Sequence, residues 1–560
     1  MRTNWKTEGK KMSMNKNIAR LAVTAGLTAA LSFGGVMAPV TMAFAAEGDN
    51  TITISQADKN GTTKFKAYQI FKAKVVDQNE SKVASDIDWA NDETEKAVIG
   101  VLKQVAASNI NDSSTAEDVA DYLAQNVRDT TDKTCVKNSD LLYKIADAVA
   151  KNSTQTGTSF DAGTTFTAPS NGYYLFVTDV LDASKPNAGT SPIFALVGGK
   201  SVTVTEKTSI PTVTKKVKDD KPNNNWADKA DSQMGQNVNY QLTGTVADNV
   251  ASFSAYKYEF YDELSAGLTA DEGSIKVYAG TDRDTATVIA ADNNYTADVT
   301  ADETTGKSTL TVKFTDLKTA VADLSAQTKI YVEYTAKLDP KKDANIVVGG
   351  NGNENTAKLV YSNNPMAEGT GTSVSDTVRD YTYALKLVKE DSANDVIRLE
   401  GVRFSIQATD PDDSKSKDLY VQEDGSLGSN EYEFTTNKSG EINVKGLDAG
   451  TYTVKETHAL DDYNTLPKFT FAISASGLNQ DEGNNTLTVS ATKGESDLVL
   501  DPVVNGGTVT LTVKNKKGSG LPLTGLNGVT FTWIAGGAVL CIGVAHLIRS
   551  RKQAEESEQE

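Results

Sequence analysis

The chain has 560 residues, more than one hydrophobic core usually holds, so we expect several domains of ordinary size. Its 74 acidic and 56 basic side chains give a formal net charge of -18, which argues against nucleic acids and anionic membranes as partners. Thr, Val, Asp, Asn and Gly are abundant whereas only 7% of the residues are aromatic, a composition that predicts a mainly β protein rather than a disordered one.

The N-terminal residues have the three parts of an export signal. Basic side chains precede an apolar run at 21–33, and Ala43-Phe44-Ala45 offers the small-x-small pattern of a signal-peptidase site. A short buried helix is the alternative, but it leaves the basic flank and the cleavage pattern unexplained. We therefore predict that residues 1–46 are a signal peptide and that the mature protein is secreted.

Residues 47–208 predict a first domain of strands with a helical insertion. Strand character is found at residues 51–54, 65–76, 173–177 and 193–197. Between these segments, Ser114 and Glu117 have the spacing of a capping box at a helix start. Ser139 can cap a second helix.

Two further β domains are predicted downstream. Ile210 and Pro211 mark a boundary, after which strand-like segments alternate with Gly, Asn and Asp turns. We expect the second domain at 209–378 and the third at 379–517. Each is consistent with an immunoglobulin-like sandwich, so the predicted fold class is mainly β, with tandem immunoglobulin-like β-sandwich domains.

Strand alternation places six polar side chains toward the cores of the second and third domains. Lys215, for example, shares the phase of Val213 and Val217, where an apolar residue is expected. The full set is Lys215, Asp262 and Asn355 in the second domain, and Lys389, Glu456 and Asn515 in the third. Each of these domains therefore presents one lysine, one acid and one asparagine to its core.

This combination suits an autocatalytic isopeptide bond. Burial makes a lysine amine neutral more easily and pushes a carboxyl toward its protonated form. The neutral amine can attack the asparagine carbonyl while the acid donates a hydrogen bond to the developing oxyanion, and ammonia leaves. Asp262 and Glu456 would be the promoting acids, in a single turnover that is the only catalysis predicted. A plain ion pair, or a lysine that faces solvent, is the alternative at each site.

Such bonds would replace disulfides as covalent staples. Cys541 lies in an apolar segment near the C-terminus, so a disulfide with Cys135 is not expected. Each isopeptide bond would tie the first strand of its domain to the last one. Closing a loop on the order of 100 residues is worth about 4–5 kcal/mol in the chain-entropy account of disulfides.

Another lysine is a candidate for linking one chain to the next. Thr203, Thr205 and Lys207 share the polar phase of a strand at the end of the first domain, so we expect the Lys207 amine to be exposed. An ordinary exposed strand lysine is the alternative, and Lys216 and Lys218 are the next candidates for the linkage.

Residues 518–560 contain a second targeting signal, in addition to the predicted signal peptide. Leu521-Pro522-Leu523-Thr524-Gly525 lies in a Gly-, Ser- and Lys-rich stretch that we expect to be extended and accessible. Residues 529–548 are apolar enough to cross a ~30 Å hydrocarbon core as a helix, and a basic tail follows. This order resembles the cell-wall sorting signal of sortase substrates. By that resemblance, a sortase cysteine attacks the Thr524 carbonyl and releases Gly525 onward; a simple single-span anchor is the alternative.

Several segments resemble domains of known surface proteins. Residues 389–391, 399–404 and 452–457 look like collagen-adhesin B-type domains. Residues 212–217, 258–268 and 355–365 resemble the isopeptide-forming second domain of Gram-positive backbone pilins, and 65–71 is similar to their N-terminal domain. Residues 202–208 are similar to the pilin motif Val-x-Val-Tyr-Pro-Lys-Asn, with Lys207 at the linking position and Thr205-Glu206 in place of Tyr-Pro.

The resemblance implies the structural backbone subunit of a covalently polymerised pilus that supports adhesion and colonisation. A sortase would join Thr524 of one chain to Lys207 of another, and the wall-anchored fibre would stand at the cell surface. The implied partners are pilus and housekeeping sortases, other copies of the chain and peptidoglycan, with accessory pilins and host surface ligands as further candidates. The alternative is a monomeric wall-anchored adhesin that binds a host ligand directly.

A secreted wall-modifying enzyme is the third class of function considered. The only histidines are His458 and His546, so neither a Ser-His-Asp triad nor a histidine metal site is expected. Residues 410–413 are rich in Asp but lack the Gly and the terminal Glu of a calcium loop, and we interpret them as an acidic turn. No cofactor and no metal are therefore predicted.

Overall fold

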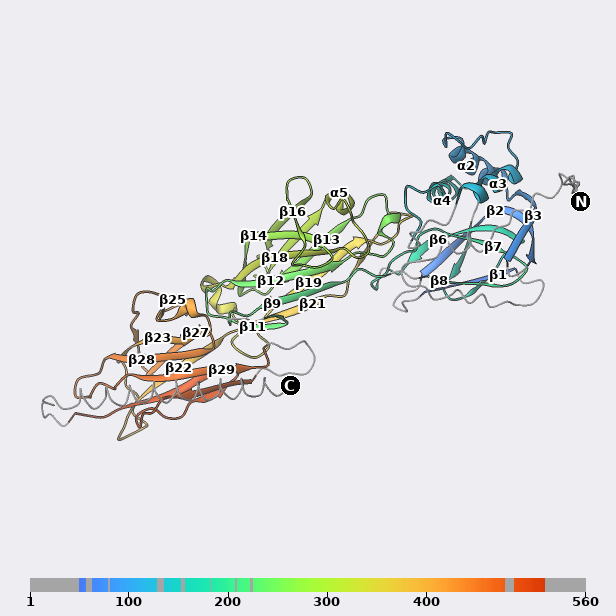
Figure 1. The fold of residues 1–560 in the computed structure, drawn as a ribbon. Coiled ribbons are helices and arrows are strands. Elements are labelled where there is room, and N and C mark those ends of the chain that lie inside the picture. Colours follow the sequence, from blue (N-terminus) through green and yellow to red (C-terminus); the bar gives the residue numbers. More distant parts are fainter. Residues whose placement is uncertain are drawn as a thin grey trace, which may run out of the picture.

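The computed structural model describes residues 50–518 except for 57–62, 79–80, 128–134, 153–156, 183, 207–208, 222–224 and 479–487. Within these residues the sheets form three β-sandwich bodies, which follow one another as an extended row (Figure 1). They are called here the first, second and third sandwich. The predicted signal peptide, Lys207, and the sorting motif with its apolar span lie outside the described residues. No helix in the described part is both long and apolar enough to cross a membrane.

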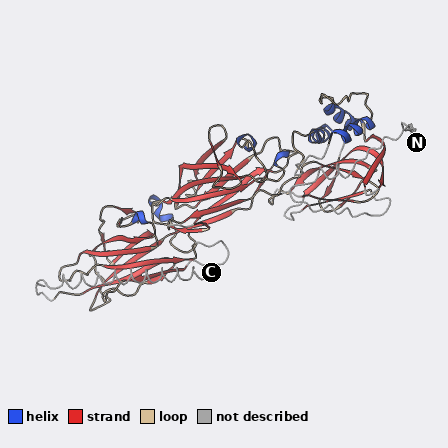
Figure 2. Cartoon of the chain, in the orientation of Figure 1, coloured by secondary structure: helices blue, strands red, loops and turns tan. Residues whose placement is uncertain are grey.

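The first sandwich packs two sheets against each other and covers one of them with helices. The sheet β5-β1-β8 faces the sheet β3-β2-β6-β7, in which β4 also pairs with β2. Tyr174 and Phe176 of β6 lie in the core between the sheets, while Tyr173 and Leu175 lie in a second core under the helices. The helices gather on one side of this sandwich (Figure 2). Its elements are β1 (Thr51–Gln56), β2 (Thr63–Gln78), β3 (Ser81–Trp89), α2 (Asp92–Leu102), α3 (Ala116–Asn126), α4 (Leu141–Asn152), β4 (Thr158–Asp161), β5 (Thr165–Thr167), β6 (Gly172–Leu181), β7 (Ile193–Val197) and β8 (Val202–Glu206).

The capping box of α3 lies one residue later than predicted. Thr115 accepts a hydrogen bond from the Asp118 N–H at 3.1 Å, and the Asp118 carboxylate accepts one from the Thr115 N–H at 2.8 Å. The predicted pair, Ser114 and Glu117, does not cap the helix; the Ser114 hydroxyl accepts a hydrogen bond from the Asn111 N–H instead. Both registers offer a hydroxyl and an acid three residues apart, so the spacing alone could not choose between them.

The other helices also depart from the prediction in detail. α4 begins at Leu141, so Asp140 rather than Ser139 directly precedes it, and the Asp140 carboxylate accepts a hydrogen bond from the Lys137 N–H at 2.9 Å. α2 was not predicted, although Asn91 caps it by accepting a hydrogen bond from the Thr94 N–H.

The second sandwich has a larger pair of sheets. One has the order β10-β9-β12-β18-β14-β15 and the other β11-β21-β19-β13-β17-β16, with β20 paired to β19. β21 runs across the predicted boundary between residues 378 and 379, and the domain boundaries stay predictions. Its elements are β9 (Val213–Lys218), β10 (Trp226–Ala227), β11 (Lys229–Asp231), β12 (Val238–Thr245), β13 (Tyr258–Leu264), β14 (Leu268–Gly280), β15 (Thr287–Ile289), β16 (Tyr295–Ala301), β17 (Ser308–Phe314), α5 (Leu317–Ala320), β18 (Lys329–Leu338), β19 (Asn353–Ser362), β20 (Thr370–Thr372) and β21 (Asp376–Tyr381).

The third sandwich pairs its first and last strands within one sheet. That sheet has the order β27-β22-β32-β31, and β22 and β32 run parallel. The opposite sheet is β25-β24-β23-β28-β29-β30, with β26 paired to β23. The elements are β22 (Tyr383–Asp391), β23 (Arg403–Pro411), β24 (Tyr420–Val421), β25 (Leu427–Gly428), β26 (Phe434–Thr435), β27 (Glu441–Leu447), β28 (Gly450–His458), β29 (Phe469–Ser476), β30 (Thr488–Lys493), β31 (Val503–Asn505) and β32 (Thr508–Asn515). The predicted fold class, mainly β with tandem sandwiches and helices in the N-terminal region, is confirmed.

Hydrogen bonds fix the junction between the second and third sandwiches. The Met234 N–H donates to the Gly446 carbonyl at 2.8 Å, and Gln233 Nε2 donates to the Gly425 carbonyl at 2.5 Å. Gly446 has φ +84°, and a Cβ there would lie 2.6 Å from the Met234 Cβ. Glycine is therefore needed at this position for both backbone conformation and close approach.

The first and second sandwiches share buried hydrogen bonds as well. The Tyr143 hydroxyl donates to the Pro365 carbonyl at 2.6 Å, and the Tyr361 hydroxyl donates to the Asn187 carbonyl at 2.9 Å. Each bond joins residues far apart in the sequence, so both junctions of the row are specified by tertiary contacts rather than by a linker alone.

Candidate cross-linking sites

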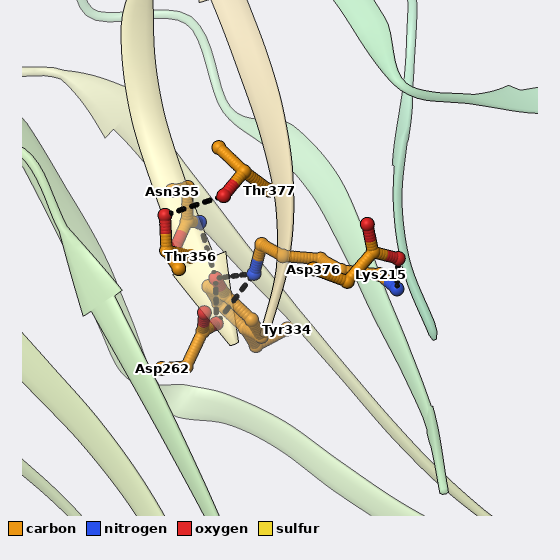
Figure 3. A network of polar contacts seen from close by, with 7 residues as sticks. All are labelled: Lys215, Asp262, Tyr334, Asn355, Thr356, Asp376 and Thr377. Carbon is orange, nitrogen blue, oxygen red and sulfur yellow. Dashed lines mark hydrogen bonds and ion pairs between the residues drawn. The ribbon is translucent and has the colours of Figure 1, made fainter. Parts of the chain in front are cut away.

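Three of the predicted residues meet between the two sheets of the second sandwich (Figure 3). β9 supplies Lys215 from one sheet, while β13 and β19 supply Asp262 and Asn355 from the other. All three side chains are 0% exposed, because each sits in the inward phase of its strand. Lys215 Nζ lies 2.6 Å from Asp262 Oδ2, which is both a hydrogen bond and an ion-pair contact.

Tyr334 on β18 completes this site and was not predicted. Its hydroxyl donates to Asp262 Oδ2 at 2.6 Å and accepts from Asn355 Nδ2 at 2.6 Å and from Lys215 Nζ at 3.1 Å. Strand alternation does not distinguish it, because positions 330, 332, 336 and 338 of β18 are also buried and apolar. A tyrosine in that phase is an ordinary core residue.

Burial dominates the electrostatics of Lys215. Loss of hydration lowers the pKa of its amine, and the attraction of Asp262 opposes this shift. The rings of Tyr240 and Tyr334 lie 5.2 and 5.3 Å from Nζ. The Lys215 backbone N–H donates to Asp376 Oδ2 at 2.7 Å, which holds β9 against β21 at this point. The amine is thus fixed in place and is more readily neutral than a surface lysine.

The third sandwich assembles its set in a different way. Lys389 on β22 and Asn515 on β32 lie on neighbouring parallel strands, while Glu456 on β28 reaches in from the opposite sheet. Lys389 Nζ donates to Asn515 Oδ1 at 2.5 Å and lies 2.9 Å from Glu456 Oε2. Asn515 Nδ2 donates to Glu456 Oε1 at 2.7 Å. The carboxylate therefore contacts both the attacking nitrogen and the amide nitrogen.

The surroundings of Lys389 also favour the neutral form of its amine. Burial lowers its pKa to about 8, although Glu456 opposes the shift. The ring of Phe404 lies 5.3 Å from Nζ and helps to exclude water. An amine with this pKa is neutral in about one molecule in ten at pH 7, far more often than a surface lysine, so it can act as a nucleophile toward the adjacent amide.

The two sites connect their strands differently, which corrects one expectation. In the third sandwich the contact joins β22 and β32, the first and last strands of that body. In the second sandwich Asn355 lies on β19, and β20 and β21 follow it. A bond there would not reach the last strand. Alternation identifies the face of a strand but not its place in the order of a sandwich, so the sequence could not show this.

Lys207, the predicted linking lysine, lies outside the described residues, just beyond the end of β8. The alternation that leads to it is present in the strand. Thr203 and Thr205 are exposed, whereas Val202 and Val204 pack, partly buried, against the core of the first sandwich.

The acidic segment at 410–413 makes structural contacts. Asp413 accepts a hydrogen bond from the Lys415 N–H at the start of the short helix η3 (Ser414–Ser416), and Asp412 pairs with Lys221 Nζ at 2.8 Å. Among the residues that the structure describes, no group of three or more His, Cys, Asp or Glu side chains is arranged to hold a metal ion.

Comparisons with known proteins agree with this architecture. Residues 384–487 match SpaA, a prealbumin-like fold domain. No curated protein matches the chain. The chain is similar in fold to the T6 backbone pilin of serotype M6 Streptococcus pyogenes, at 16% identity and a TM-score of 0.50, over 85% of this chain and 100% of that chain. The full-length major pilin SpaD from Corynebacterium diphtheriae matches at 15% identity and a TM-score of 0.46, over 86% of this chain and 100% of that chain. Over most of its length, the chain therefore has the fold of a Gram-positive backbone pilin.

Proposed function

We propose that this protein is the backbone subunit of a covalently polymerised, cell-wall-anchored pilus, whose second and third sandwiches are locked by internal isopeptide bonds. The observation that carries the proposal is the pair of fully enclosed Lys–acid–Asn sites in two tandem sandwiches. A buried ion pair is weak evidence for stability, because desolvation offsets most of its attraction. As the precursor of a covalent bond, the same arrangement suits a protein that has to resist pulling.

The reaction can be followed atom by atom in the third sandwich. The neutral Lys389 amine attacks the side-chain carbonyl carbon of Asn515 and forms the new C–N bond. Glu456 takes a proton from the attacking nitrogen through one oxygen and supplies a proton to the amide nitrogen, which lies 2.7 Å from its other oxygen. The C–N bond of the amide then breaks, and ammonia leaves. One amide replaces another, and no external reagent is consumed.

The shape of the molecule supports an end-to-end fibre. The first sandwich lies at one end of the row and the third at the other (Figure 1). Thr524 lies a few residues beyond the described end at residue 518, and such a segment spans at most about 20 Å. A sortase that joins Thr524 to Lys207 of another chain would therefore link the third sandwich of one subunit to the first sandwich of the next.

Immunoblots of cell-wall extracts test this function. A backbone subunit is expected to give a ladder of bands that resists sodium dodecyl sulfate, and Lys207→Ala is expected to abolish the ladder while wall-attached monomer remains. Lys72→Ala is the matched control, because Lys72 is an exposed strand lysine on β2 of the first sandwich and is not a candidate for the linkage. A single discrete band from the unmodified chain would contradict the proposal and favour the monomeric adhesin.

A further inference from the structure

The two cross-linking sites differ in how the acid reaches the leaving nitrogen. In the third sandwich Glu456 contacts both reacting nitrogens directly, one with each oxygen. In the second sandwich the acid is the shorter Asp262, whose Oδ2 contacts Lys215 Nζ. Asn355 Nδ2 does not donate to this carboxylate; its hydrogen bond goes to the Tyr334 hydroxyl at 2.6 Å. Tyr334 in turn donates to the Asp262 oxygen at 2.6 Å, so it occupies the gap left by the shorter acid (Figure 3).

We propose that Tyr334 is a second catalytic residue of the second sandwich, besides Asp262, and that its hydroxyl relays a proton from Asp262 to the leaving nitrogen of Asn355. This inference rests on the isopeptide bond proposed above for Lys215 and Asn355. It assigns a chemical role to a residue that would otherwise be part of an aromatic core.

The proton balance of the relay closes without any other group. Lys215 and Asp262 share one proton, and when it resides on the carboxyl the neutral amine is free to attack the Asn355 carbonyl carbon. As the new C–N bond forms, Tyr334 gives its hydroxyl proton to the amide nitrogen and takes the carboxyl proton of Asp262. Asp262 then accepts a proton from the former amine, the amide C–N bond breaks, and ammonia leaves. Tyrosine and aspartic acid end in the protonation states in which they began.

The neighbouring Tyr240 provides a matched control for the loss of the Tyr334 hydroxyl. Its ring stacks on Tyr334 with centroids 5.3 Å apart, and it is equally buried. Within the described residues its hydroxyl has no hydrogen-bond partner, so it makes no hydrogen bond to the reacting atoms. Tyr240→Phe therefore removes a hydroxyl from the same aromatic pair without removing a proton donor of the proposed relay.

The test is a time course of bond formation in the full mature chain. Protein recovered unfolded from inclusion bodies is diluted into refolding buffer, and intact mass with tandem mapping of the cross-linked peptides reports each bond separately. Tyr334→Phe is expected to slow the Lys215–Asn355 bond by about 100-fold, the usual scale of general acid–base catalysis. Tyr240→Phe should form it at the unmodified rate. The Lys389–Asn515 bond should form normally in both variants, which shows that the substitutions leave the third sandwich folded and its reaction intact.

Equal rates for Tyr334→Phe and the unmodified chain would overturn the relay, while loss of the bond in Asp262→Ala would still support the underlying cross-link. If the unmodified chain never forms the Lys215–Asn355 bond, the proposed cross-link itself fails. Should Tyr334→Phe not fold, 3-fluorotyrosine at position 334 keeps the ring and hydroxyl but makes the phenol more acidic. The relay predicts faster bond formation with this residue, and an unchanged rate would contradict it.

Discussion

At the residue scale, the two Lys–acid–Asn sites predict the mass of the mature chain. The mature chain should have a mass lower than its composition by two molecules of ammonia, because each isopeptide bond releases one. Asp262→Ala and Glu456→Ala should each restore the mass of one ammonia, since each removes the proton carrier from one site only. Intact-mass spectrometry measures this directly. A chain of full composition mass would refute both bonds, and two losses in either variant would mean that a different acid promotes the reaction.

The lowered pKa of Lys389 gives the third-sandwich reaction a definite pH dependence. Below about pH 8 the amine is mainly protonated and cannot attack, so the rate should fall about tenfold for each unit of decreasing pH. Above that value the rate should level off, because the amine is already neutral. The check is the mass time course after refolding at several pH values, with circular dichroism to confirm that folding is faster than bond formation. A rate that is flat from about pH 6 to about pH 9 would count against a neutral-amine attack.

Strand alternation was sufficient to identify the six residues of the two Lys–acid–Asn sites, but not the residues that surround them. A lysine or an acid in the inward phase of a strand is conspicuous, since its burial has a large cost unless it is paired. Tyr334 carries no such signal, and its role depends on the distance across the sandwich from its hydroxyl to Asp262 and Asn355, which lie on neighbouring strands of the opposite sheet. That distance follows from sheet packing, which a single sequence does not show.

At the element scale, a second set of carboxyls gathers where the second and third sandwiches meet. Burial raises the pKa of Asp219 and of Asp231, and neighbouring acids add to the effect. The charged and titratable groups around them come from several elements of both sandwiches: Asp220, Lys221, Asp380, Tyr383, Asp412 and Asp448. The Tyr383 hydroxyl donates to Asp231 Oδ2 at 2.8 Å, which bridges the two bodies.

This junction should be more stable in mild acid than at neutral pH. Asp219 and Asp231 have folded pKa values of about 8 and about 7, above their unfolded value, so the unfolded chain releases these protons first as the pH rises above about 4. Stability is therefore lost from about pH 4 toward the neutral range. We expect the melting temperature of the second and third sandwiches to fall by at least about 2–4 °C over this range, the equivalent of about 1 kcal/mol for bodies of this size.

Asp231→Asn provides the control for the junction. The amide oxygen can still accept the Tyr383 hydrogen bond, but the position no longer titrates. The variant should therefore melt at a temperature that depends less on pH, measured by calorimetry. If the unmodified chain melts at the same temperature at about pH 5 and about pH 8, the buried carboxyls do not govern this junction.

Element types were largely predictable, and their ends were less so. The strands at 173–177 and 193–197 correspond to β6 and β7, because short continuous runs of apolar, aromatic and β-branched residues favour strands that are buried on both faces. The cap of α3 was displaced by one residue, because two hydroxyl–acid pairs had the same spacing. The order of strands within each sheet, which decides that Asn355 is not on the last strand of its sandwich, depends on contacts between distant segments.

At the scale of the whole molecule, the two cross-links should respond differently to force. In the third sandwich a bond between Lys389 and Asn515 would carry the load past residues 390–514. In the second sandwich, residues 356–381 follow Asn355 and lie outside the locked loop, so they could extend by at most about 90 Å. Single-molecule pulling should show only this short extension from the second sandwich. Glu456→Ala should add the full unfolding length of the third sandwich, and a long extension of that body in the unmodified chain would contradict its lock.

The most direct test of a covalent pilus backbone is the chemical linkage between chains. High-mass polymer purified from the wall should be digested, and its peptides sequenced by tandem mass spectrometry. The account predicts a branched peptide in which the Thr524 carbonyl of one chain is joined to the Lys207 amine of another. If Thr524 is found joined only to wall peptide amines, and no peptide joins two copies of the chain, the protein is not a pilus backbone subunit.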